Sequence, residues 1–306
     1  MKPKIFTIGE VLYDIVFKNG KPVSGCPGGS MLNTSVSLGR LNAPVSFVSE
    51  LGNDATGKII IDFLTSNNVQ TKSIQIYKEG QTSIAIAVLD DENNASYSFY
   101  KNYPEARLFS KNISKINKND IVLFGSSYSL QKEIRKHFYD LLQKAKKTST
   151  VLIYDPNIRP SSIKSNPKFK TFFKENISVS DIIRCSDEDI KYACGINDIH
   201  SFYSSFMNEN QILICTSGKG KISLHTEKIN KKYSVPKIES VSTIGAGDNF
   251  NAGLIYSLFK MKIRKQDIAS LEIKQWDKII NIGVDFAIDV CKSYDNFISK
   301  EFAENV

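Results

Sequence analysis

Small residues and one carboxylate come together in residues 242–253, whose sequence is STIGAGDNFNAG. The segment opens a stretch of apolar residues at helical spacing that continues to Met261. Small residues at a helix start let backbone N–H groups converge on an anion, and the helix dipole favours negative charge there. Gly245, Ala246 and Gly247 are therefore a predicted phosphate-binding turn.

Asp248 follows this turn directly, although a carboxylate beside a bound phosphate repels it. Phosphoryl transfer to a hydroxyl group would explain the carboxylate. This reaction needs a base that accepts the hydroxyl proton and donors that stabilise the transferring oxygens. The alternative is a glycine-rich turn with Asp248 as an ordinary first-turn residue. A dinucleotide-binding fingerprint is excluded, since Phe250 occupies the place of its third glycine.

A second glycine-rich segment, residues 52–59, reads GNDATGKI and nearly matches the P-loop of nucleotide-binding proteins. The P-loop hydroxyl that binds Mg²⁺ would have to come from Ile59, which has none. We therefore reject this segment as a nucleotide site.

Near the N-terminus, Gly28 and Gly29 precede a helical pattern that carries Asn33. Paired glycines permit close backbone approach to a ligand, and an Asn side chain can both donate to and accept from sugar hydroxyls. A plain turn before a helix is the alternative. Asp14, on the preceding β-prone run, would by itself be a solvated strand carboxylate.

Residues 155–160 (DPNIRP) follow an apolar strand, and ligands of open α/β sheets gather at the carboxyl ends of strands. The two prolines stiffen the loop and would hold Asn157 and Arg159 outward. Arg159 suits a phosphate or a sugar hydroxyl, and its alternative is an ion pair with Asp155.

Apolar runs of strand length recur along the chain, each later followed by a segment with helical spacing. The runs are residues 4–9, 45–49, 121–125, 151–154, 181–184 and 211–215. This alternation predicts an α/β fold with a largely parallel, doubly wound sheet.

Two β-prone segments break this rhythm, one turning at Asn19-Gly20 and one at the polar run 90–94. Such connections are hairpin signals, so we expect a small antiparallel sheet beside the main one. Tyr97 alternates with apolar neighbours on it, as in a sheet with one wet face. The sheet would serve as a lid or as a dimer surface.

The boundaries expected for these lid strands are about 11–25 and 76–104. Within the chain we find no internal repeat and no Pro/Gly/Ser-rich linker that would mark a domain boundary. We therefore predict one domain spanning residues 1–306.

The bulk properties exclude several classes of protein. The net charge of +8 comes from dispersed lysines without a basic, aromatic-interleaved motif, so we predict no nucleic-acid partner. No apolar stretch approaches the roughly 20 residues of a membrane span, so we expect no membrane contact and a cytoplasmic location. Five scattered cysteines and three distant histidines favour reduced thiols over a structural metal site.

Together and in this order, these segments resemble the ribokinase-like (PfkB) family of carbohydrate kinases. The resemblance runs from the Gly28-Gly29 region to the helix after Gly253, and also includes residues 155–160 and 216–220 (TSGKG). It implies a three-layer α/β sandwich with a small β-sheet lid, a small-molecule sugar under the lid, and ATP with Mg²⁺ beside it.

The resemblance also implies a role for each matching residue. Asp248 would be the catalytic base, with Gly245, Ala246 and Gly247 as the anion hole. The expected sugar-binding residues are Asp14, Gly28, Gly29, Asn33, Tyr97 and Arg159. The expected nucleotide-binding residues are Asn157, Ser186, Thr216, Gly218, Gly220 and Asn281.

Three departures from the family pattern affect its ions. Ser242 stands where an acidic residue usually heads the second signature, and residues 291–296 lack a usual glycine. Both regions help build the family's monovalent-cation site, so we predict weak or absent K⁺ activation. The family's Asn-x-x-Glu reads Ser186-x-x-Asp189 here, and Asp189 could reach Mg²⁺ through a bridging water.

Among subfamilies, residues 9–14, 155–160 and 186–189 look most like bacterial fructokinases, with transfer to fructose giving the 6-phosphate. A 2-keto-3-deoxygluconate kinase is the alternative, followed by ribokinase or a nucleoside kinase. A non-catalytic sugar- or nucleotide-binding regulator on the same fold is a competing class. A nicotinamide-dependent oxidoreductase is disfavoured, and a homodimer paired through the hairpins is expected.

Overall fold

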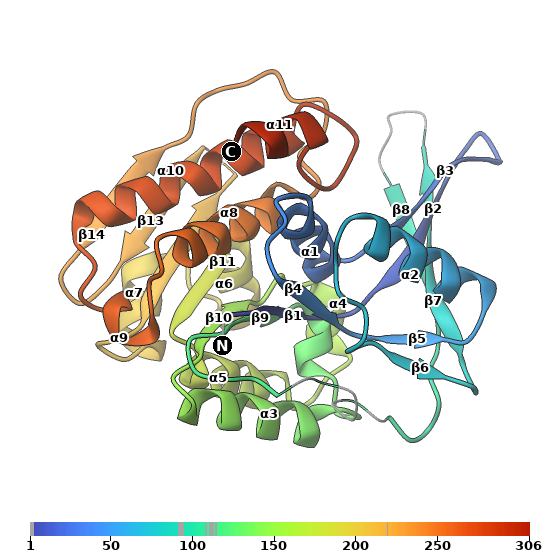
Figure 1. Cartoon of the computed structure of the whole chain (residues 1–306), viewed down its shortest axis with the longest axis horizontal. Coiled ribbons are helices and arrows are strands. Elements are labelled where there is room, and N and C mark those ends of the chain that lie inside the picture. The colour runs from blue at the N-terminus through green and yellow to red at the C-terminus, as the bar shows by residue number, and fades with distance from the viewer. Residues whose placement is uncertain (1–2, 91–94, 108, 110–112, 114, 219) are drawn as a thin grey trace.

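A large mixed sheet forms the centre of the protein (Figure 1), in a computed structural model that describes residues 3–90, 95–107, 109, 113, 115–218 and 220–306. Its strand order is β14-β13-β12-β11-β10-β9-β1-β4. The strands are β1 (Ile5–Ile8), β4 (Val45–Val48), β9 (Ile121–Gly125), β10 (Val151–Asp155), β11 (Ile182–Ser186), β12 (Ile212–Ser217), β13 (Lys221–His225) and β14 (Asn230–Ser234).

The six strands from β4 to β12 pair in parallel, and all six were predicted as apolar runs. Strands β13 and β14 add an antiparallel edge that the sequence analysis did not predict. The outermost strand, NKKYS, has no buried residue, so it carries no apolar run that would reveal it.

Helices cover both faces of this sheet. One layer holds α1 (Ser30–Arg40), α2 (Ala55–Ser66), α8 (Ala246–Lys260), α9 (Lys265–Ile268), α10 (Ile273–Val290) and α11 (Lys300–Asn305). The opposite layer holds the 3₁₀ turn η1 (Ser127–Leu130), α3 (Arg135–Lys147), α4 (Pro160–Lys164), α5 (Phe169–Val179), α6 (Asp187–Cys194) and α7 (Ile199–Phe206). The predicted three-layer α/β sandwich is therefore confirmed.

Strand alternation divides the core into two clusters. Along β9, Ile121 and Leu123 face the layer of α1, α8 and α10, whereas Val122 and Phe124 face the layer of α3 and α5. Because both faces are buried, the strand reads as a continuous apolar run. Burial of this kind supplies most of the stabilising free energy of such a core.

A second sheet of four strands lies beside the main body, in the order β3-β2-β7-β8. Its strands are β2 (Leu12–Lys18), β3 (Lys21–Gly28), β7 (Gln81–Leu89) and β8 (Ala95–Asn102). Both predicted hairpins are present, but β2 and β7 pair in parallel, so the expectation of a purely antiparallel sheet was wrong. The two hairpins join through their first strands, and these run in the same direction.

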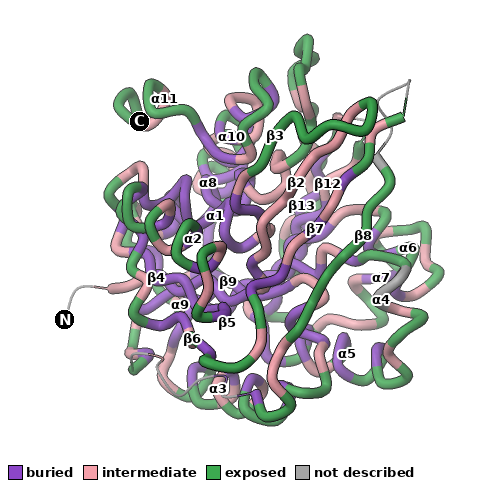
Figure 2. Tube along the Cα trace, turned by 90° about the vertical axis from the view of Figure 1, so that its right-hand side faces the viewer, coloured by how far each residue is buried: buried purple, intermediate pink, exposed green. Residues whose placement is uncertain are grey.

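The expected lid range of 76–104 also included a strand that belongs elsewhere. Strand β6 (Gln75–Tyr77) pairs with β5 (Glu50–Gly52) in a separate two-stranded sheet. Figure 2 shows that β8 is exposed from residue 96 to residue 102, whereas the neighbouring β7 is largely covered.

Within the described residues, no helix is both long and apolar enough to cross a membrane. All five cysteines are free thiols, of which Cys185, Cys215 and Cys291 are buried.

Candidate functional site

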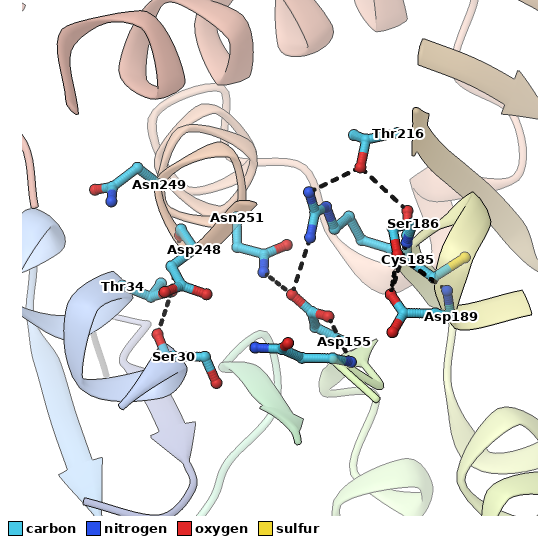
Figure 3. A network of polar contacts seen from close by, with 12 residues as sticks. Ser30, Thr34, Asp155, Cys185, Ser186, Asp189, Thr216, Asp248, Asn249 and Asn251 are labelled. Carbon is cyan, nitrogen blue, oxygen red and sulfur yellow. Dashed lines mark hydrogen bonds and ion pairs between the residues drawn. The ribbon is translucent and has the colours of Figure 1, made fainter. Parts of the chain in front are cut away.

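Helix α8 begins at the glycine-rich turn and aims its N-terminus at the carboxyl ends of the central strands (Figure 3). Gly245 caps the helix in a left-handed conformation, with φ of 81°, and a Cβ there would lie 2.9 Å from the carbonyl oxygen of Asn296. Only glycine accepts both conditions without strain. No side chain of the described residues caps this helix end, although the Ala246 N–H donates to the Thr243 carbonyl oxygen at 3.3 Å. The other N–H groups of the first turn and the helix dipole favour an anion here.

Asp248 lies in the first turn of α8 and contacts α1 twice. Asn33 Nδ2 donates to Asp248 Oδ2 at 2.8 Å, and Thr34 Oγ1 donates to the Asp248 carbonyl oxygen at 2.8 Å. Burial raises the pKa of the Asp248 carboxyl, while the Asn33 hydrogen bond and the charges of Arg184 and Arg159 oppose that rise. The carboxylate is thus fixed in direction and more basic than a solvated one.

Asn33 has a second polar atom available. Its Oδ1 is buried and has no hydrogen-bond partner among the described residues. A buried acceptor without a partner is costly, and a ligand hydroxyl would satisfy it. The amide is therefore able to join a ligand hydroxyl to Asp248.

Gly28 and Gly29 allow the small sheet to pack closely beside the N-terminus of α1. A Cβ on Gly28 would lie 1.9 Å from Asp14 Oδ2, so the Asp14 carboxylate rests directly against the Gly28 backbone. Gly29 adopts φ of 134°, and a Cβ there would meet the Glu10 carbonyl oxygen at 2.5 Å. Burial raises the pKa of Asp14 to about 6. A partly buried carboxylate of this kind is suited to accept hydrogen bonds from ligand hydroxyls.

Asp155, at the end of β10, is the centre of a second polar cluster (Figure 3). Its Oδ2 accepts from Asn251 Nδ2 at 2.5 Å and pairs with Arg184 Nη1 at 3.2 Å. Burial raises the Asp155 pKa to about 6 against the opposing charge of Arg184. The cluster ties helix α8 to strands β10 and β11, and Arg184 Nη2 reaches Thr216 Oγ1 of β12 at 3.0 Å.

Ser186 and Asp189 form a capping box at the start of α6. Asp189 Oδ2 accepts from the Ser186 backbone N–H at 2.8 Å and from its hydroxyl at 2.7 Å, and Oδ1 accepts from the Ile158 N–H at 2.6 Å. The Asp189 carboxylate is thereby occupied with holding two loops together. Any contact it makes with a metal ion would more readily run through water than replace these bonds.

Of the remaining predicted residues, those of the 155–160 loop are close to the site. Asn157 donates its N–H to Asp155 Oδ1 at 3.1 Å and has φ of 36°. Arg159 is exposed, yet its charge is near enough to oppose the rise that burial causes in the Asp248 pKa. The alternative of an ion pair between Arg159 and Asp155 is wrong, because Asp155 pairs with Arg184 instead.

Other predicted residues lie at the periphery. Tyr97 is 53% exposed on β8 and stacks on Phe99 at 6.0 Å, and Asn281 is exposed on α10. Gly218 is exposed after β12, and Gly220 forms the following turn with φ of 72°. Among the described contacts, none joins Tyr97 or Asn281 to Asp248 or Asp155.

Three residues of the site were missed by the sequence analysis: Thr34, Arg184 and Asn251. Asn251 lies three positions after Asp248 and so shares its helix face, which was a usable signal. Arg184 interrupts an apolar run, and a charge in a buried parallel strand requires a partner.

A scan against family models matches residues 2–273 to the pfkB family of carbohydrate kinases. The chain therefore belongs to the pfkB carbohydrate kinase family, which makes it a sugar kinase by family.

Among curated relatives, a fructokinase of Rhizobium leguminosarum bv. trifolii is 28% identical over 278 residues, covering 88% of this chain and 84% of the relative. Fructokinase-2 of Solanum lycopersicum is 26% identical over 284 residues, covering 88% and 85%.

Two solved structures show the fold. A fructokinase with bound ATP from Xylella fastidiosa has a TM-score of 0.85 at 18% identity, covering 100% of this chain and 98% of that one. Aminoimidazole riboside kinase from Salmonella enterica, complexed with aminoimidazole riboside and an ATP analogue, has a TM-score of 0.83 at 16% identity, covering 99% and 98%. The fold is accordingly ribokinase-like, with a smaller separate sheet beside the main one.

Proposed function

We propose that this protein transfers the γ-phosphoryl group of ATP to the hydroxymethyl group of D-fructose, giving fructose 6-phosphate. The observation that carries the proposal is the Asp248 carboxylate, partly buried in the first turn of a helix whose N-terminus is open to an anion. Fructose is the proposed sugar because the two relatives described above are named fructokinases.

In the proposed reaction, the oxygen of the sugar hydroxyl bonds to the γ-phosphorus while Asp248 accepts the proton of that hydroxyl. The bond from the γ-phosphorus to the bridging oxygen of ADP breaks at the same time. Backbone N–H groups of the turn at Gly245, Ala246 and Gly247 stabilise the charge on the transferring oxygens, and the Ala246 N–H would exchange its 3.3 Å bond to the Thr243 carbonyl oxygen for the phosphoryl group. The raised pKa of Asp248 supports its role, because a more basic carboxylate accepts the proton more readily.

We assign the sugar to the space between the lid and α1. Asp14 and Asn33 would receive its hydroxyl groups, and Gly28 and Gly29 allow the backbone to approach. Arg159 would close the site from the 155–160 loop. Tyr97 would contribute only if β8 moves inward, since its ring is 53% exposed here.

We assign ATP to the ends of β11 and β12, with contacts from Asn157, Ser186, Thr216, Gly218, Gly220 and Asn281. Among the described residues, no group of three or more His, Cys, Asp or Glu side chains could hold a metal ion. Mg²⁺ is therefore assigned as an ion that binds together with the nucleotide. Asp189 would hold waters around it, and the ion when bound neutralises phosphate charge.

K⁺ activation is proposed to be weak or absent. The two segments concerned do lie together, since the Val241 N–H donates to the Cys291 carbonyl oxygen at 2.8 Å, but Ser242 brings no carboxylate to them. A titration of KCl against choline chloride at constant ionic strength tests this, and a strong K⁺ requirement would refute it.

We further propose a single kinase domain whose four-stranded sheet serves as the lid, and a homodimer formed through that sheet. Val88 and Tyr100 are 49% and 60% exposed on one face of the sheet, and Tyr97 and Phe99 are 53% and 58% exposed on the other. Exposed apolar side chains of this kind are suited to contact with a second copy. Sedimentation velocity at several concentrations would decide, and a monomer throughout would refute the dimer.

The test of the proposed function is Mg·ATP turnover, measured as ADP release, with fructose, 2-keto-3-deoxygluconate, ribose and a nucleoside. We expect strong activity with fructose and a 6-phosphate product by ³¹P and ¹³C NMR. Preference for another sugar would move the substrate while keeping the reaction. Silence with every sugar, despite ATP binding, would favour a non-catalytic regulator.

A further inference from the structure

Arg184 is a buried cation that lies directly beneath the predicted phosphate-binding turn. Its side chain is 9% exposed and projects from β11 toward the N-terminus of α8. A Cβ built on Gly247 would lie 2.8 Å from Arg184 Nη1 and 2.9 Å from Nη2. The guanidinium therefore occupies the space that any larger residue at position 247 would need.

Two hydrogen bonds fix the guanidinium plane. Nη1 contacts Asp155 Oδ2 at 3.2 Å, and Nη2 donates to Thr216 Oγ1 at 3.0 Å. Arg184 Nε is buried with no hydrogen-bond partner among the described residues. An arginine has five N–H donors, so this one is held in place while donors remain for a ligand.

Neutralising Asp155 does not by itself account for this arrangement. Asp155 Oδ2 also accepts from Asn251 Nδ2 at 2.5 Å, and Asp155 Oδ1 accepts from the Asn157 N–H. Replacing a buried ion pair with apolar residues is often neutral for stability, so a pair aimed at an anion-binding turn suggests another use. Planar guanidinium groups match the oxygens of phosphate closely.

We propose that Arg184 is a further catalytic residue. Its guanidinium group, on the buried side of Gly247, binds the phosphoryl group while that group is transferred. The inference rests on the proposed kinase function and adds a positive charge to an anion hole otherwise made of backbone N–H groups. A cation fixed in advance stabilises charge that develops in the transition state more than charge already present in bound ATP.

The test is steady-state kinetics of Arg184→Ala with and without added guanidinium chloride. Loss of one such donor typically lowers kcat about 10²–10³-fold, and we expect that loss with KM values for ATP and sugar changed less than about threefold. Guanidinium at concentrations that leave the fold intact should restore turnover in a saturable way. Arg184→Lys should retain intermediate activity because it keeps the charge and loses the planar fork.

Arg135→Ala is the matched control. Arg135 is 8% exposed and pairs with Glu175 at 2.6 Å, but it lies on α3 in the opposite helix layer. It should lose stability without losing kcat per folded molecule and without responding to guanidinium. The double variant Arg184→Met/Asp155→Asn removes both charges together, and it should stay folded while its kcat remains low.

A kcat of Arg184→Ala within threefold of wild type would overturn the inference, as would a loss confined to KM. A fall in kcat without guanidinium rescue would also overturn it, because a merely structural arginine predicts that result. A wild-type protein that phosphorylates no sugar would overturn the proposed function and the inference together, whereas an active wild type with an active Arg184→Ala overturns the inference alone.

Discussion

Three aspartates at the site share a raised pKa for one physical reason and differ in what opposes it. Burial is the first cause for Asp14, Asp155 and Asp248 alike. Arg184 opposes it at Asp155 and Asp248, and no opposing group accompanies Asp14 in the described residues. The acid–base behaviour of each carboxyl therefore follows from its neighbours rather than from its residue type.

Removing the Asn33 side chain should shift the pH dependence of catalysis. The Asn33 hydrogen bond stabilises the charged form of Asp248, so its loss raises the Asp248 pKa further. For Asn33→Ala, the acidic limb of the kcat/KM profile should move to higher pH, because the base is protonated over a wider range. An unmoved or lowered limb, in a folded variant, would contradict the assignment of Asp248 as the titrating base.

Asp14→Asn should stabilise the protein at high pH while weakening sugar binding. A carboxyl whose folded pKa is about 6 favours the protonated state on folding, so its contribution is present at low pH and lost as pH rises through about 6. At pH 8 the variant should melt roughly 2 °C higher than wild type, the change expected for about 1 kcal/mol in a chain of this size.

At pH 4 that difference should vanish, and the KM for sugar should rise chiefly above about pH 6, where the wild-type carboxyl is ionised. A variant less stable than wild type at pH 8 would show that the Asp14 charge is already compensated in the fold.

At the scale of elements, the close contacts between strands and helices set the geometry of the site. Strand β3 ends in Gly28, which allows Asp14 of β2 to lie against its backbone, and helix α8 begins at Gly245 beside Asn296. These are contacts between segments far apart in sequence or in different hairpin arms, so local spacing does not reveal them.

Gly28→Ala should raise the KM for sugar about tenfold or more, because its methyl group would lie 1.9 Å from Asp14 Oδ2 and displace that carboxylate. A double-mutant cycle with Asp14→Ala provides the control. In the Asp14→Ala background the same glycine change should have little further effect, since the clashing atoms are gone. Additive effects of the two changes would mean that Gly28 acts independently of Asp14.

The segments that connect the lid to the body meet at a buried carboxylate, Glu50. It accepts hydrogen bonds from Tyr128 Oη at 2.6 Å and Tyr77 Oη at 2.5 Å and forms an ion pair with Arg107. Tyr103 stacks on the Arg107 guanidinium at 3.8 Å. This cluster anchors the chain where it enters and leaves the small sheet.

Arg107→Met should destabilise the protein by about 3–5 kcal/mol, the usual cost of leaving a buried charge without its partner. Glu50 is 0% exposed, so water cannot replace the lost guanidinium. Urea denaturation measures the change, and Lys58→Met, which breaks an exposed ion pair with Asp62, is the control and should cost less than about 1 kcal/mol. Equal effects of the two substitutions would contradict the structural role of the cluster.

Over the whole molecule, the features that could be predicted from the sequence are those that arise from continuous local patterns of residues. The six parallel strands are apolar runs because both faces are buried, and the turn at Gly245–Gly247 is visible because small residues cluster before a helix. Strand β14, polar and at the edge, and the parallel pairing of β2 with β7 depend on tertiary placement. The same holds for Arg184, since no local rule shows which of the nearby acids it pairs with.

The central claim is that Asp248 accepts the proton of a sugar hydroxyl as the phosphoryl group moves. The most direct test is rapid-quench single turnover of fructose and ATP with wild type and Asp248→Asn, with Asp62→Asn, an exposed residue of α2, as control. We predict that Asp248→Asn lowers the transfer rate about 10²–10⁴-fold while fructose and ATP still bind, and that the control leaves the rate unchanged. Near-normal transfer by a folded Asp248→Asn would contradict the account.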